Sequence, residues 1–184
     1  NNYDVSYIDN TSSTINQAAL TITAAASTKT YDGTTTAATG ATPTVTSGSL
    51  QGGDTFTSLT ETYTDKNAGT GKTLKAAAVI NDGNGGNNYA VTYVDNTSGV
   101  INQAALTIVA AASTKTYDGT TAVTGATPTV TVGSLQGGDT FTSLTEAYTD
   151  KNAGTGKTLQ AAAVINDGNN GNNYAVTYVD NTSG

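Results

Sequence analysis

Pairs of acidic residues are the first candidates for chemistry in this sequence. Glu61 lies close to Asp65, and Glu146 and Asp150 repeat the same pair. Hydrolysis by an acid pair needs two carboxylates held across a cleft, but Asp65 begins a Gly-rich turn. His and Cys, the usual general base and nucleophile, are absent. We therefore expect solvated surface charge at these positions and no enzyme activity.

Lysines occur in two patterns that could bind phosphate or form crosslinks. The sequence GTGKT at residues 69–73 and 154–158 is similar to a phosphate-binding loop. The first Gly of that motif is missing and no helix is expected to follow, which favours a simple turn. Lys29, Lys66 and Lys72 could form isopeptide crosslinks with Asn, but lysines in turns are more often exposed.

Oxygen-bearing side chains on Gly-rich loops suggest a weak calcium site. If the strands alternate in direction, the loop at residues 81–88 and the turn at residues 31–33 meet where the second half of the chain begins. Carboxylate and amide oxygens suit Ca²⁺. The expected ligands are Asp32, Asp82 and Asn84 at this joint, with Asp118 and Asp167 at the free end. Hydrated turn residues are the simpler interpretation.

Tyrosines and N-x-S sequences offer two possible contacts with carbohydrate. Alternating tyrosines could stack on a polysaccharide, although alternate positions on a strand more often face the core. These tyrosines are Tyr3, Tyr7, Tyr89, Tyr93, Tyr174 and Tyr178. Asn10, Asn96 and Asn181 each begin an N-x-S sequence. A polar turn closed by the Asn side chain is the favoured interpretation of these three sites.

The composition limits the possible partners. The net charge is −7, charged residues make up 11% of the chain, and Cys is absent. An acidic surface repels nucleic acid and anionic membranes, so neither is expected as a partner. Without Cys there is no disulfide framework. No apolar run approaches the length of a membrane span, and the missing initiating Met and signal peptide predict an internal fragment of a longer chain.

The chain is built from two tandem repeats. The sequence NNYAVTYVDNTSGVINQAALTI at residues 87–108 recurs with small changes at residues 1–22, and it begins a third time at Asn172. A repeat of this kind determines the domain organisation. We expect residues 1–16 to be the terminal hairpin of a preceding repeat. Residues 17–102 form repeat 1, and residues 103–184 form repeat 2 without its last strand.

Short alternating segments predict the structure of each repeat. Leu20 and Ile22 alternate with threonines, and residues 73–80 place Leu74, Ala76, Ala78 and Ile80 on one face. Alternation with a period of two is typical of half-buried strands. Gly-rich turns separate the segments, and no helical period is present. The prediction is an all-β fold of tandem immunoglobulin-like β-sandwiches, with a β-grasp-like or other Gly-rich all-β module as the alternative.

Four motifs in order connect the chain with a known family. KTYDGT at residues 29–34, the Gly-Gly-Asp turn, DKNAGTGK at residues 65–72 and the NNY strand entry resemble the YDG repeat. That repeat and the related MBG repeats occur in bacterial surface adhesins similar to filamentous haemagglutinin. The resemblance implies an extracellular stalk or biofilm-matrix role with one immunoglobulin-like sandwich per repeat, and it supplies no catalytic residues.

The expected function is that of a structural spacer on the bacterial cell surface, with a carbohydrate-binding adhesive module as the alternative. The expected partners are neighbouring repeats of the same protein and, in the alternative, a polysaccharide. Unpaired strand edges recruit strands from other chains. We therefore expect head-to-tail packing, with residues 1–16 of one molecule against repeat 2 of the next.

Overall fold

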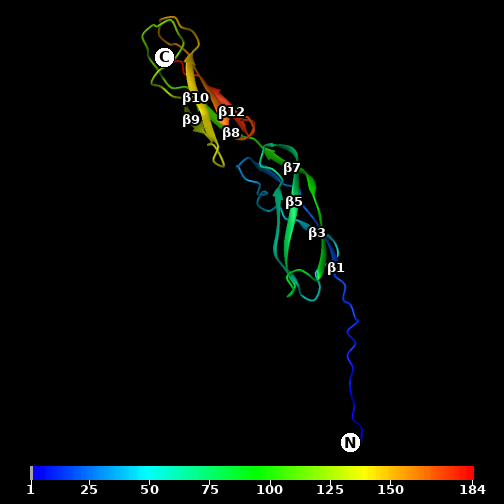
Figure 1. The fold of residues 1–184 in the computed structure, drawn as a ribbon. Coiled ribbons are helices and arrows are strands. Elements are labelled where there is room, and N and C mark those ends of the chain that lie inside the picture. The colour runs from blue at the N-terminus through cyan, green and yellow to red at the C-terminus, as the bar shows by residue number, and fades with distance from the viewer. Residues whose placement is uncertain (1) are drawn as a thin grey trace.

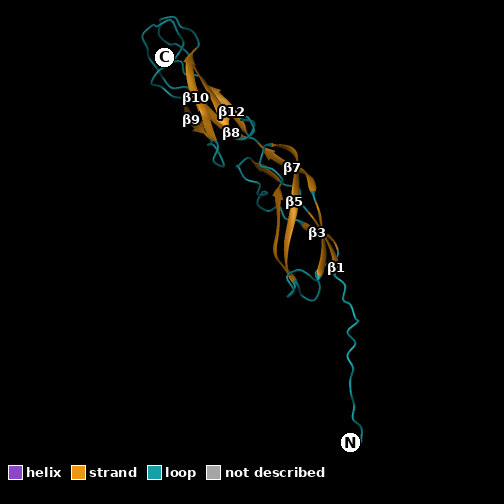
Figure 2. Ribbon diagram, in the orientation of Figure 1, coloured by secondary structure: helices purple, strands orange, loops and turns teal. Residues whose placement is uncertain are grey.

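The structure, a computed structural model, describes residues 2–184 and contains only strands, turns and loops (Figure 2). The predicted all-β class is therefore confirmed. The two repeats lie end to end, and the N-terminal segment extends away from repeat 1 (Figure 1). Over the described residues, nothing forms a helix long and apolar enough to cross a membrane.

Repeat 1 is a sandwich of two sheets. The three-stranded sheet has the order β3 (Thr44–Ser47), β1 (Ala18–Thr23), β6 (Tyr89–Val94). The four-stranded sheet has the order β2 (Thr28–Thr30), β7 (Asn96–Asn102), β5 (Gly69–Asn81), β4 (Thr55–Tyr63). The sandwich is confirmed, and its finer assignment as immunoglobulin-like stays a prediction.

Alternation of apolar and polar residues determines which faces meet in the core. In β1, Leu20 and Ile22 are buried, whereas Thr21 and Thr23, which alternate with them, are only partly buried. In β5, Leu74 and Ile80 are buried, and their inward face continues between them, as the sequence predicts. Leu20, Ile22 and Ile80 belong to one buried cluster, so the two sheets pack face to face.

Two parallel pairs give the repeat its direction. β6 pairs with β1 in parallel from Ala18↔Tyr89 to Thr23↔Val94, and β2 pairs with β7 in parallel. The chain passes from β6 to β7 through Asp95 and changes sheet there. Residues 89–102 therefore run through the repeat in one direction, as residues 18–30 do. The expected alternation of strand direction between Tyr89–Val94 and Val100–Gln103 is wrong, because the chain passes into the other sheet at Asp95 without reversing its direction.

Residues 2–16 do not form the expected hairpin. They contain no strand, and their apolar side chains are exposed, with Ile15 exposed to 99%. The equivalent residues of repeat 1 lie in β6 and β7, which pair with β1, β2 and β5 rather than with each other. In a complete repeat these two segments therefore belong to different sheets and do not form a hairpin. Asn1 lies outside the described residues.

Repeat 2 follows the same plan. One sheet has the order β12 (Tyr174–Val179), β8 (Ala104–Val109), β9 (Thr129–Val132), and the other pairs β10 (Thr140–Tyr148) with β11 (Leu159–Asn166). β12 and β8 are again parallel. Residues 114–116, the counterpart of β2, are not a strand. One buried cluster contains Leu74 and Ile101 of repeat 1 together with Leu106 and Tyr174 of repeat 2, so the core continues from one repeat into the next.

Candidate functional site: the joint between the repeats

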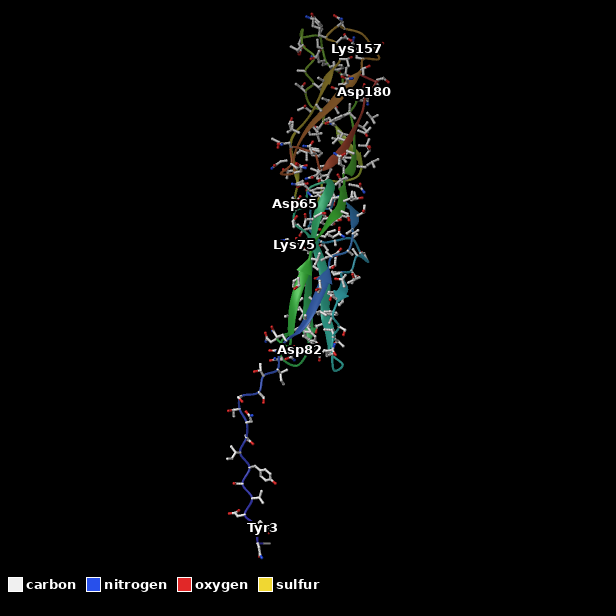
Figure 3. All side chains as sticks on the ribbon, turned by 90° about the vertical axis from the view of Figure 1, so that its right-hand side faces the viewer. Tyr3, Asp65, Lys75, Asp82, Lys157 and Asp180 are labelled. Carbon is white, nitrogen blue, oxygen red and sulfur yellow. The ribbon has the colours of Figure 1, made fainter. Side chains whose placement is uncertain are left out.

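The joint is formed by turns from both repeats. Repeat 1 contributes the turn after β2, at residues 31–33, and the turn between β4 and β5, at residues 64–68. Repeat 2 contributes the turn before β10, at residues 136–139, and the loop before β12, at residues 167–173. Strand direction places the first pair at the exit end of repeat 1 and the second pair at the entry end of repeat 2. Figure 3 shows Asp65 at this exit end.

Asp139 is the centre of the polar contacts at the joint. Its side chain is 5% exposed, and one carboxylate oxygen, Oδ2, accepts hydrogen bonds from Tyr31 of repeat 1 at 3.0 Å and from Tyr174 of repeat 2 at 2.7 Å. Its other oxygen, Oδ1, lies 3.6 Å from the ammonium of Lys66. A buried carboxylate needs partners of this kind, since an unpaired one is strongly destabilising.

The two tyrosines pack against each other and remain hydrogen-bond donors. Their rings meet edge to face, with centroids 5.5 Å apart. Burial raises the pKa of Tyr31, and the nearby carboxylate of Asp139 raises it further despite Lys66. Burial and Asp139 also raise the pKa of Tyr174. Both hydroxyls therefore stay protonated and donate to Asp139 at any physiological pH.

Asn173 joins the repeats through its amide. It is fully buried; its Oδ1 accepts the Ala68 N–H at 2.8 Å, and its Nδ2 donates to Asn67 at 3.3 Å. The backbone N–H of Asn173 donates in turn to the carboxylate of Asp167 at 3.0 Å. One backbone N–H and one side-chain amide oxygen of repeat 1 are therefore satisfied by a side chain of repeat 2.

Two glycines allow the turns to approach closely. Gly33 has φ +77° and Gly137 has φ +57°, in the left-handed region that favours glycine. A Cβ on Gly33 would lie 2.4 Å from the Cα of Gly137. Any larger residue at either position would push the repeats apart.

The expected calcium ligands do not converge at the joint. Figure 3 shows Asp82 at the entry end of repeat 1, beside the N-terminal segment. Asn84 lies in the same loop between β5 and β6, whereas Asp32 follows β2 at the exit end. The expected placement is wrong because β6 runs parallel to β1, so the loop before it lies where β1 begins. By the same relationship Asp167 lies at the joint and not at the free end, where Asp118 does lie. Within residues 2–184, no group of three or more acidic side chains is arranged to hold a metal ion.

Each of these carboxylates instead closes a local turn. Asp32 accepts hydrogen bonds from Lys29 and from the Thr34 N–H, and Asp118 has equivalent bonds in repeat 2. The bond from Lys115 helps lower the pKa of Asp118 to about 2. Asp82 accepts three backbone N–H groups, and so does Asp167. Burial raises the pKa of Asp167, but these N–H groups outweigh it and hold that pKa below its usual value.

Of the candidate catalytic acids, Glu61 and Glu146 are not the solvated surface charges that the sequence predicts, because their strands place them in the interior. Glu61 and Glu146 are buried in strands, where each accepts one backbone N–H, from Ala25 at 2.6 Å and from Ala111 at 2.7 Å. Their second carboxylate oxygens are buried without a hydrogen-bond partner among the described residues. Asp65 is in a turn and pairs with Lys72. These acids and lysines therefore hold the backbone together locally.

The candidate carbohydrate contacts fall into three groups. Tyr89 and Tyr174 are buried and bond to aspartates, whereas Tyr93 and Tyr178 are each 43% exposed. The side chains of Tyr3 and Tyr7 are exposed on the unpaired N-terminal segment. In the N-x-S sequences the Asn oxygen accepts the N–H of the Ser two residues later, which is the contact expected of a polar turn, although at Asn96 it lies within β7.

Sequence reasoning missed the residues of the joint. The sequence predicts that Tyr31 is part of a turn, and its pattern does not distinguish Asp139 or Asn173 from other polar turn residues. A large aromatic residue in a motif otherwise typical of an exposed turn was the available signal, because tyrosine in a turn gains most when a neighbour covers it.

Two end-to-end sandwiches with a shared core define a tandem all-β repeat protein. The YDG domain family matches residues 16–98 and residues 102–183, one match for each repeat. The chain therefore belongs to the YDG domain family. No curated protein and no solved structure gives a significant match.

Proposed function

We propose that the chain is part of a structural stalk in a secreted or surface-anchored bacterial adhesin of the filamentous-haemagglutinin-like kind, where it acts as a spacer or biofilm-matrix scaffold. The observation that supports a spacer is the joint. The neighbouring repeat covers Tyr31, which is only 2% exposed. Asp139 accepts hydrogen bonds from side chains of both repeats. A joint of this kind resists bending more than a flexible linker does.

The path of the chain also supports a spacer. Each repeat receives the chain at one end and releases it at the other, because the first and last runs are parallel. Added repeats then lengthen the molecule along one axis. In tandem arrays each repeat contacts only its neighbours, so length increases with repeat number without new kinds of contact.

Small-angle scattering tests the spacer role directly. Chains with two, three and four repeats are expected to grow by a constant increment in maximum dimension. A flexible array would grow roughly as the square root of its length, and that result would refute the spacer. Antibody labelling of intact producing cells tests the surface location; labelling seen only after lysis would contradict it.

A carbohydrate-binding role is the second candidate, favoured by the half-exposed Tyr93 and Tyr178 at equivalent positions. Two tyrosines in register along a rod could stack on successive units of a polysaccharide. A glycan array with the intact chain tests this role. Binding that is lost in a Tyr93→Ala, Tyr178→Ala double variant would support it, and the absence of binding would rule it out for the glycans on the array.

A further inference from the structure

The outer strands of the two sheets differ in how their free edges are protected. A free edge exposes backbone N–H and C=O groups, which natural sheets shield with bulges, short strands, Pro or charged side chains. In repeat 1, β3 is only four residues long and has a register shift against β1. β4 has a register shift against β5, and a bridge from Thr36 to Thr62 covers its end. These two edges are therefore protected.

β6 and its counterpart β12 lack these protections. Both strands read YAVTYV, without Pro, Gly or a charged residue. Among the residues that the structure describes, each pairs on one side only, in parallel and without a register shift, and each is outermost in its sheet. A regular, uncharged edge of β-branched and aromatic residues is the kind that pairs with a further strand.

The free edge is a property of the repeat itself. Within residues 2–184, β12 has no partner on its outer side although repeat 1 precedes it, and β6 has none although repeat 2 follows it. The strand that follows β6, β7, pairs with β2 and β5 instead. Neither a preceding repeat nor a following one therefore covers this edge.

The ladder with β1 determines which backbone groups are free on β6. The carbonyls of Asn88 and Val94 each accept an N–H of the β1 segment at 2.9 Å, so the even-numbered residues face β1. Consecutive residues of a strand point their backbone groups to opposite sides. The odd-numbered residues therefore face outward, and of these the Tyr89 N–H bonds within its own loop. Val91 and Tyr93 present the free groups of the edge, as their counterparts do on β12.

The side chains beside these groups leave the edge open. The ring of Tyr93 reaches toward β5, where its Oη accepts the Ala78 N–H at 3.3 Å, and Tyr178 accepts the Ala163 N–H at 3.2 Å. These rings lie between the two sheets and not beside the outer strand. Thr92, between the two outward-facing residues, has an exposed side chain. The backbone of β6 is therefore accessible to another strand.

We propose that β6 and β12 are strand-pairing edges that join two copies of this chain side by side. The strands pair antiparallel about a twofold axis at Thr92, with Val91 of one copy opposite Tyr93 of the other. Each such pair exchanges both of its backbone hydrogen bonds, and the two copies of Thr92 face each other across the axis. Because β6 and β12 have the same sequence, either strand can pair with either.

The partner is a second copy because this edge is its own complement. The chain has a net charge of −7, so contacts between most surfaces of two copies are repulsive, whereas the charge-free edges can meet without repulsion. β-branched and aromatic residues also favour contacts across paired strands. Each chain has two such edges, so association can continue beyond a dimer. The proposal rests on strand pairing and not on the spacer or adhesin role.

The absence of Cys from the chain allows a direct test of the register. The two copies of Thr92 form a non-hydrogen-bonded pair, whose Cα atoms lie about 4.5 Å apart, within reach of a disulfide. Thr92→Cys is therefore expected to form a disulfide-linked dimer on mild oxidation. Thr60→Cys, also exposed but on the protected strand β4, is the control and is expected to crosslink far less. Equal crosslinking of the two variants would overturn the proposed pairing.

Sedimentation velocity from micromolar to millimolar concentration measures the assembly of the whole chain. The mass is expected to rise above the 18.4 kDa of one chain. The double variant Thr92→Lys, Thr177→Lys is expected to abolish this rise, because two ammonium groups would meet at each axis. The control Thr60→Lys, Thr145→Lys adds the same charge to β4 and β10 and is expected to assemble as wild type does.

Amide hydrogen exchange identifies the groups that pair. At high protein concentration the N–H groups of Val91 and Tyr93 are expected to become protected, whereas the Thr92 N–H, which faces β1, changes little. A wild-type chain that stays monomeric throughout, or a Thr92→Lys, Thr177→Lys variant that assembles as wild type does, would overturn the proposal. Protection of Val91 that requires added polysaccharide instead of more protein would overturn it too. The scattering test of the spacer measures covalently linked repeats in dilute solution, so the two proposals can fail separately.

Discussion

Tyr31 and Tyr117 occupy the same position in the two repeats, yet Tyr31 is 2% exposed and Tyr117 is 60% exposed. The difference arises because repeat 2 covers the exit end of repeat 1. Tyr31 and Tyr117 therefore provide an internal control for the effect of the joint. The residue type and the local motif are the same, but only Tyr31 is covered by a neighbouring repeat.

Tyr31→Ala is expected to destabilise repeat 1 by about 3–5 kcal/mol, the range for removing a large buried aromatic side chain. It removes the contact with Tyr174 and one hydrogen bond to Asp139. Tyr117→Ala is expected to change the stability by less than about 0.5 kcal/mol. Denaturant unfolding measures both, and equal effects would show that the joint adds no stability.

Gly33→Ala is expected to open the joint. The new Cβ meets backbone atoms of Gly137 at 2.4 Å, and φ is +77°. Gly119→Ala has the same φ of +77° but meets nothing within 4 Å, so it carries only the backbone strain of about 1 kcal/mol. The stability difference between the variants measures the contact. Scattering should show a bent or broadened shape for Gly33→Ala alone, and identical profiles would contradict the close approach.

Asp167 is expected to make the joint sensitive to acid. The pKa of Asp167 in the folded protein lies below its ordinary value of about 4, because the hydrogen bonds from three backbone N–H groups outweigh the effect of burial. A depressed pKa gives stability that is present above that ordinary value and is lost as pH falls through the folded pKa. The free energy of unfolding of Asp167→Asn should therefore be lower than that of wild type at pH 7, by about 2 kcal/mol. This difference in free energy should become smaller below about pH 4.

Asp82→Asn is the matched control for this pH dependence, since Asp82 accepts the same set of backbone bonds at the exposed entry end. Thermal unfolding measured across the pH range should show that Asp82→Asn loses less stability at neutral pH than Asp167→Asn does. A stability difference between wild type and Asp167→Asn that stays constant from pH 7 to pH 2 would contradict the stabilising role of the ionised Asp167 side chain.

Much of the fold follows from local pattern, and the joint does not. Alternation predicts β1 and the inward face of Leu74 to Ile80, because a half-buried strand needs a period of two. Strand direction, in contrast, cannot be predicted from local pattern. The break between β6 and β7 at Asp95 is compatible, from sequence alone, with a hairpin or with a change of sheet, and only packing against β1 decides. The misplacement of Asp82 follows from that one ambiguity. Asn173 and Asp139 could not be found, because the contacts that make them part of the joint, with Ala68 and Tyr31, reach into another repeat.

Glu61→Ala is expected to destabilise repeat 1 by about 1–3 kcal/mol, because the Ala25 N–H loses its acceptor in a part-buried position. Glu146→Ala should do the same in repeat 2 through Ala111. Thr60→Ala, at the exposed neighbouring position, is the control and should be nearly neutral. If Glu61→Ala unfolds at the same denaturant concentration as the control, the carboxylate contributes nothing net.

The parallel pairing of β1 with β6 determines how a repeat responds when its two ends are pulled apart. Tension on the chain draws β1 toward the entry end, along the axis of the strand beside it. The ladder from Ala18↔Tyr89 to Thr23↔Val94 is then loaded in shear, and its hydrogen bonds must break together instead of one after another. Forced unfolding depends on the height of that barrier and not on equilibrium stability. A YDG repeat of modest thermodynamic stability can therefore hold a large mechanical load.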